Sequence, residues 1–118
     1  MTKITAAITG IHAWAPEYIL TNSELEKMVD TTDEWIMSRT GIKERRILKG
    51  EGLGTSYMAI KCAEDLIQKS NINPEEIDLV LVGTATPDLP VASTAAYVAS
   101  KIGATIPSDH ILKFAPSA

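Results

Sequence analysis

The stretch Asp30–Arg46 holds the side chains best suited to bind a ligand. Trp35 and Arg39 stand four residues apart, so they share one face if the stretch is helical. An indole beside a guanidinium is a platform for a flat, electron-rich ring. Five of the eleven Lys and Arg residues fall between Arg39 and Lys49, although the formal net charge is −4. A local positive patch in an acidic protein indicates an anionic ligand, and the stacking platform indicates a nucleotide.

A purely structural interpretation of these residues stays open beside the first. Trp35 also fits a core position on an amphipathic helix, and the basic run also fits a solvated strand face. On the pattern alone, the structural interpretation is favoured.

Trp35 and Arg39, the side chains suited to bind a ligand, are expected on a short helix. Thr31 followed by Glu34 is a capping box, which predicts a helix over about Thr32–Ser38. Gly41 tolerates the left-handed conformation that ends a helix. The basic residues follow on Gly41–Lys49, which is predicted to be extended.

The segments before this stretch predict a strand and another short helix. Residues 3–12 alternate apolar side chains as a buried strand does. Thr21 and Glu24 form a capping box, which predicts a helix over Ser23–Met28.

The segments after it complete an α/β pattern. Thr55–Lys69 and Ser93–Ile102 show apolar residues at helical spacing, and Pro74 follows Asn73 as a helix start does. Ile77–Gly83 is a nearly continuous apolar run, which is typical of a central strand buried on both faces of a parallel sheet. Alternating strands and helices around such a strand predict an α/β fold.

Composition limits the classes of protein that fit. The chain has 118 residues, 45% hydrophobic and 22% charged, which is ordinary for one soluble domain or part of one. An isoelectric point near 5.1 argues against nucleic acid as a general partner. One cysteine predicts a reducing, cytoplasmic setting, and the isolated His12 and His110 lack metal-ligand spacing. No apolar run approaches the ~18 residues of a membrane span, so no membrane partner is expected.

The phrase VDTTDEWIMSRTGIKERR resembles the N-terminal signature of β-ketoacyl-acyl-carrier-protein synthase III, in the thiolase-like superfamily. The resemblance covers about residues 3–105. It implies that residues 1–105 are the N-terminal portion of a thiolase-like α/β fold and that residues 106–118 are a divergent tail. In that family the Trp and Arg of the motif bind the adenine end of coenzyme A, with help from the Thr before them. The resemblance therefore implies coenzyme-binding roles for Thr31, Trp35 and Arg39.

The resemblance also implies an activity and its partners. The family condenses acyl-coenzyme A, typically acetyl-coenzyme A, with malonyl-acyl-carrier protein to start fatty-acid synthesis. Acyl-coenzyme A is then a substrate, no cofactor is bound permanently, and the acyl-carrier protein and a second copy of the full-length chain are the expected partners. A non-catalytic fragment that binds coenzyme A or another subunit is the alternative.

No catalytic residue of the family can be carried onto this chain. The family works through a cysteine, a histidine and an asparagine, and its spacing puts the cysteine at Pro116. Cys62 falls mid-helix among apolar residues, where a thiol behaves as a small hydrophobe. His110 does not match the motif of the catalytic histidine. We therefore expect an inactive chain, and the sharp end of the match at Thr105–Ile106 suggests a truncated or frameshifted reading of a longer gene.

The loop Thr86–Ser93 is the last segment with an implied role. In the family a bulky residue of this loop reaches across the dimer into the neighbour's acyl pocket. That position falls on Val91, where phenylalanine is common in relatives. An ordinary surface loop is the alternative, and the sequence does not define an acyl-chain preference.

Overall fold

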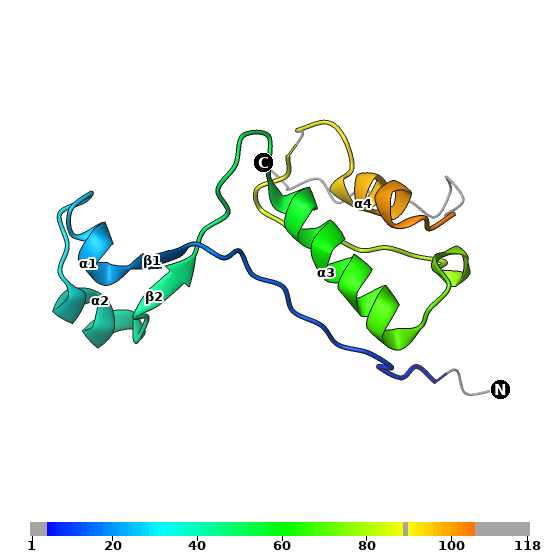
Figure 1. The fold of residues 1–118 in the computed structure, drawn as a ribbon, viewed down its shortest axis with the longest axis horizontal. Helices are drawn as coiled ribbons and strands as arrows, with labels where there is room; N and C mark the ends of the chain where they lie inside the picture. Colours follow the sequence, from blue (N-terminus) through cyan, green and yellow to red (C-terminus); the bar gives the residue numbers. More distant parts are fainter. Residues whose placement is uncertain (1–4, 89, 106–118) are drawn as a thin grey trace. The chain divides into compact units, whose positions relative to one another are not determined.

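The computed structural model describes residues 5–88 and 90–105, which divide into two compact units (Figure 1). One unit is Ala15–Leu53, and the other combines residues 5–14 with the described chain from residue 54 onward. Over the described residues, no helix has both the length and the apolar character needed to cross a membrane.

The unit Ala15–Leu53 is built from two short strands and two short helices. Strand β1 (Ile19–Thr21) pairs antiparallel with strand β2 (Glu44–Arg46). Helices α1 (Asn22–Leu25) and α2 (Asp33–Thr40) lie between them in the sequence. The connection between the two paired strands therefore carries both helices, as the blue and cyan part of Figure 1 shows.

Helix α1 begins with the capping box that the sequence predicts. The Thr21 hydroxyl accepts a hydrogen bond from the Glu24 amide at 3.2 Å, and the Glu24 carboxylate accepts one from the Thr21 amide at 3.2 Å. These two bonds satisfy backbone donors that the first turn of a helix leaves unpaired. The helix is shorter than predicted, because it ends at Leu25 rather than Met28.

The second capping prediction is wrong by one residue. Thr32, not Thr31, is the N-cap of α2, and its hydroxyl accepts from the Trp35 amide at 3.2 Å. Asp33 and Glu34 lie in the first turn, where the helix dipole favours negative charge. Gly41 ends the helix in the left-handed conformation (φ 69°), as predicted.

The other unit contains the two longer helices. Helix α3 (Thr55–Ser70) and helix α4 (Thr94–Ile102) match their predicted bounds within one residue and pack against each other (Figure 1). A short 3₁₀ turn, η1 (Pro74–Glu76), follows its cap Asn73. The side chains of α4 buried in this unit are Ala95, Val98 and Ala99.

The strands predicted over residues 3–12 and Ile77–Gly83 are not formed in the described chain, which begins at residue 5. Neither residues 5–12 nor Ile77–Gly83 form a strand. A strand exists through hydrogen bonds to a neighbouring strand, and among the described residues none pairs with either segment. Consequently Ile8 is 84% exposed and Leu81 is 62% exposed. Both segments carry the composition of buried strands without a partner that buries them.

Candidate functional site

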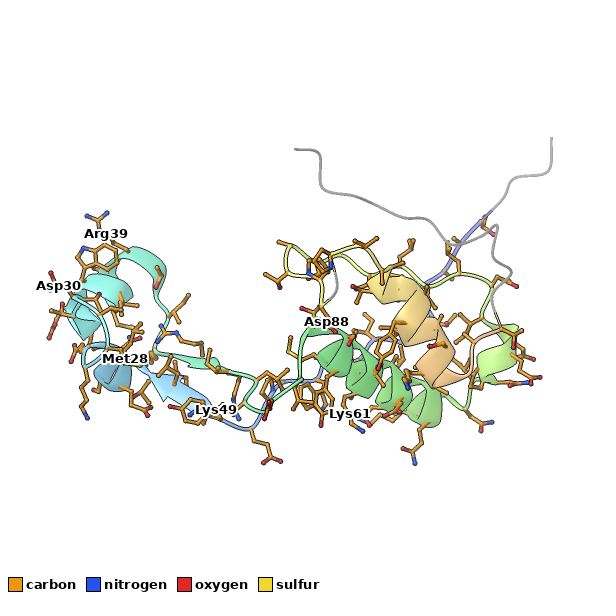
Figure 2. All side chains as sticks on the ribbon, turned by 90° about the horizontal axis from the view of Figure 1, so that it is seen from above. Met28, Asp30, Arg39, Lys49, Lys61 and Asp88 are labelled. Carbon is orange, nitrogen blue, oxygen red and sulfur yellow. The ribbon has the colours of Figure 1, made fainter. Side chains whose placement is uncertain are left out.

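Trp35 and Arg39 lie together on helix α2. The Arg39 guanidinium carbon is 5.0 Å from the centre of the Trp35 ring, within the range of a cation–π contact. Trp35 is 55% exposed, whereas its neighbour Ile36 is buried in the unit. Figure 2 shows Arg39 projecting from α2 on the side away from the two strands. The predicted juxtaposition is confirmed, Trp35 is not a core residue, and we call this pair the Trp35–Arg39 platform.

Thr31 lies outside helix α2. It precedes the N-cap Thr32 and is half-buried. Because Thr32 performs the capping, the Thr31 hydroxyl is not consumed by the helix N-terminus. The positive end of α2, which favours anions, is next to it in the chain.

The basic residues after α2 are engaged within their own unit. Arg45 donates to the Asn22 side-chain oxygen at 2.9 Å and to the Leu20 carbonyl at 3.5 Å. Arg46 donates to the carbonyls of Pro16 and Glu17 at 3.4 and 3.1 Å. These guanidinium groups fasten β2 to β1 and to the chain before it, so their geometry supports a structural role rather than ligand contact.

Lys49 is also engaged, through an aromatic ring. Its ammonium lies 3.2 Å from the centre of the Tyr18 ring, and the Tyr18 hydroxyl donates to Glu24 at 3.0 Å. The backbone hydrogen bond from Thr21, followed by that hydroxyl, lowers the pKa of Glu24 below its ordinary value. The carboxylate at the start of α1 is therefore charged over a wider range of acid pH than a free glutamate.

Helix α3 carries the chain's single cysteine, whose thiol is hydrogen-bonded to a backbone carbonyl. Cys62 is partly buried, and its thiol donates to the His12 carbonyl at 3.5 Å. The His12 ring lies between Asp65 and Lys69, at 3.3 Å from each. Over residues 5–88 and 90–105, no group of three His, Cys, Asp or Glu side chains could hold a metal ion. Pro116 and His110 lie outside the described residues.

No local sequence pattern predicts the role of Asn22, whose side chain joins several elements of this unit. Asn22 is 2% exposed, and its side chain donates to Asp33 and to the Ile42 carbonyl. Asparagine is a poor helix former that usually marks a turn or cap, and here Thr21 already supplies the cap.

The curated sequences and the solved structures that resemble this chain come from the same kind of protein. No protein-family model matches the chain. The β-ketoacyl-[acyl-carrier-protein] synthase III of Phocaeicola vulgatus is 57% identical over 103 residues, covering 87% of this chain and 31% of that protein. The crystal structure of 3-oxoacyl-[acyl-carrier-protein] synthase III from Aquifex aeolicus VF5 is 46% identical with a TM-score of 0.74, over 81% of this chain and 30% of that one. The corresponding Thermus thermophilus structure is 41% identical with a TM-score of 0.76, over 86% and 31%.

These matches show that the described chain is a partial α/β fold of the thiolase-like type. More narrowly, the chain is similar to the N-terminal part of β-ketoacyl-acyl-carrier-protein synthase III, as its signature phrase predicts. The chain spans 31% of the length of these curated relatives.

Proposed function

We propose that this chain supplies the coenzyme A-binding part of an acyltransferase of the β-ketoacyl-acyl-carrier-protein synthase III type. The relatives at 57% identity carry that name. The reaction is the condensation of acyl-coenzyme A with malonyl-acyl-carrier protein in fatty-acid synthesis. Acyl-coenzyme A is a substrate in this proposal, and the acyl-carrier protein and a second full-length copy are the partners. The proposal includes a cytoplasmic location.

The observation that carries the proposal is the Trp35–Arg39 platform. An exposed indole offers a stacking surface for adenine, and such a contact is worth on the order of 1–3 kcal/mol per base. The Arg39 guanidinium adds a planar fork of donors beside the ring, which suits the phosphates of the same nucleotide. Thr31 adds a hydroxyl close in sequence to the positive end of α2.

The proposal gives the described residues a binding role and no covalent step. Acyl transfer in this class requires an activated nucleophile. The Cys62 thiol is directed to the His12 carbonyl, which is an acceptor and not a base that could activate it for attack on a thioester. The family's cysteine position falls on Pro116, which has no thiol. We therefore expect binding without condensation in the 118-residue chain.

The test is a titration in which binding is measured from the NMR signals of coenzyme A. Line broadening of the adenine protons of coenzyme A, measured by NMR at low protein concentration, reports weak binding without a protein signal. Trp35→Ala should weaken affinity roughly 5- to 150-fold, which is the stacking energy converted to a ratio. Arg39→Lys keeps the charge but loses the fork, so it should fall between the wild type and Arg39→Ala.

Trp14→Phe is the matched control. In the other unit, the Trp14 ring packs edge-on against the Tyr57 ring, with 5.8 Å between the ring centres. A phenylalanine at position 14 keeps an aromatic contact there and should leave the affinity for coenzyme A unchanged. If Trp35→Ala and Arg39→Ala bound coenzyme A as well as the wild type, the platform would be structural and the proposal would fail.

A further inference from the structure

One buried amide holds helix α2 at both ends. The Asn22 side-chain nitrogen donates to the Asp33 carboxylate at 2.6 Å and to the Ile42 carbonyl at 2.9 Å. Asp33 is the first residue of α2, and Ile42 lies just beyond its C-cap. The two hydrogen bonds therefore bracket the helix that carries the Trp35–Arg39 platform.

The remaining polar groups of Asn22 are also paired. Its side-chain oxygen accepts from Arg45 at 2.9 Å, and its backbone amide donates to the Lys43 carbonyl at 3.3 Å. An asparagine amide has two donors and one acceptor oxygen, and all of these are used here. In the described part of the chain, no buried side-chain nitrogen or oxygen lacks a partner. A fully satisfied buried network specifies one arrangement of the elements that it joins.

The partners of Asn22 come from separate elements. They lie at the start of α2, just after its end, and on β2, while Asn22 itself opens α1. Helix α2 has only eight residues, and one of them, Ile36, is buried. With so little apolar anchorage of its own, α2 depends on this polar network for its orientation.

We propose that Asn22 is a positioning residue, which fixes α2 through Asp33 and so orients the platform for the nucleotide end of coenzyme A. This inference rests on the proposed function. An aspartate at position 22 has nearly the same shape but loses both side-chain donors. Its carboxylate would face the Asp33 carboxylate and the Ile42 carbonyl, so like charges and lone pairs would meet. Helix α2 would then spend less time in the competent orientation, and the apparent affinity would fall in proportion.

Two readouts test the inference in the full 118-residue chain. The first is the ligand-observed titration with coenzyme A. The second is the fluorescence anisotropy of Trp35 in a Trp14→Phe background, which reports the rigidity of α2 without any ligand. Asn22→Asp should lower the anisotropy and weaken coenzyme A binding about tenfold, as expected if the competent fraction falls to about one-tenth.

Two variants at position 33 distinguish loss of the Asn22 hydrogen bond from general misfolding. Asp33→Asn keeps an oxygen that accepts from Asn22, whereas Asp33→Ala removes it, and both lose the same negative charge from the exposed first turn. Asp33→Asn should keep the wild-type anisotropy and affinity to within about twofold, and Asp33→Ala should behave like Asn22→Asp.

The two proposals fail in distinguishable ways. If Trp35→Ala weakens binding but Asp33→Ala and Asp33→Asn are indistinguishable in both anisotropy and affinity, Asn22 is not a positioning residue. If Asp33→Ala lowers the anisotropy but Trp35→Ala leaves binding unchanged, Asn22 orders α2 and the coenzyme A role of the platform is wrong.

Discussion

Asp88 is expected to stabilise helix α3 from a distant part of the chain. The N-cap of α3 is Gly54, which has no side chain to accept a hydrogen bond. The Asp88 carboxylate takes that role, because both of its oxygens accept from the Ser56 amide, at 3.0 and 3.2 Å. Figure 2 shows Asp88 beside the start of α3. The perturbation is Asp88→Ala.

The magnitude follows from the kind of contact that is lost. Replacing a capping side chain by alanine costs about 0.5–2 kcal/mol. Loss of the charge at the positive helix end contributes about 0.3–1 kcal/mol of this cost. A neighbouring bond from the Thr55 hydroxyl to the Thr86 carbonyl, at 2.7 Å, remains and limits the loss. We expect about 1 kcal/mol, or a drop in Tm of roughly 4 °C for a chain of this size.

The assay is thermal unfolding followed by circular dichroism at low protein concentration. Asp88→Asn keeps an acceptor oxygen without the charge, so its Tm should lie between those of the wild type and Asp88→Ala. Asp78→Ala is the control, because Asp78 is an exposed carboxylate on the segment before this loop. Equal Tm values for Asp88→Ala and Asp78→Ala would refute the capping role.

Three further predictions concern other parts of the chain. After incubation with radiolabelled acyl-coenzyme A and denaturing electrophoresis, the chain should carry no label, and a stable thioester on Cys62 would contradict this. The exposed, unpaired run that contains Leu79 and Leu81 should cause self-association, so Leu79→Lys with Leu81→Lys should lower light scattering at equal concentration; unchanged scattering would exclude this run as the cause. The lowered pKa of Glu24 adds stability that is complete above the pKa of the unfolded chain and is lost as pH falls through the folded pKa. The stability difference between wild type and Glu24→Gln should therefore shrink as the pH falls from the pKa of the unfolded chain through the lower folded-state pKa, and a constant difference would show that Glu24 titrates normally.

Local signals in the sequence were sufficient to predict the bounds of α3 and α4. The amphipathic spacing within Thr55–Ser70 predicts α3 within one residue, and the capping box at Thr21 is present in the structure. At α2 the same approach selected the wrong one of two adjacent threonines. Both residues are good N-caps, and the structure uses Thr32, whose hydroxyl accepts from the Trp35 amide.

The strands could not be predicted in this way, because pairing is not local. The apolar run Ile77–Gly83 has the composition of a buried strand, but a strand also needs neighbours that donate and accept its hydrogen bonds. The short strands that do form, β1 and β2, lie more than twenty residues apart and pair through Leu20 and Arg45 at their centre.

In the candidate site too, contacts within one helix could be predicted from the sequence, whereas contacts between elements could not. The spacing of Trp35 and Arg39 on one helix predicts their contact, since it depends only on helix geometry. The roles of Asn22 and Arg45 depend on the fold of the whole unit, and nothing in their local sequence indicates them. The run of basic residues in the sequence predicts a positive patch for an anionic ligand, yet Arg45 and Arg46 donate to side-chain and backbone oxygens within the unit.

The most direct test of the central claim is a measurement of proximity between ligand and ring. Intermolecular nuclear Overhauser effects can be recorded between the adenine protons of coenzyme A and the two indoles of the 118-residue chain. Stacking on the exposed ring of α2 predicts cross-peaks from the adenine protons to Trp35 and none to Trp14. Bound coenzyme A with cross-peaks to Trp14 alone, or to neither indole, would contradict the claim that the Trp35–Arg39 platform holds the nucleotide.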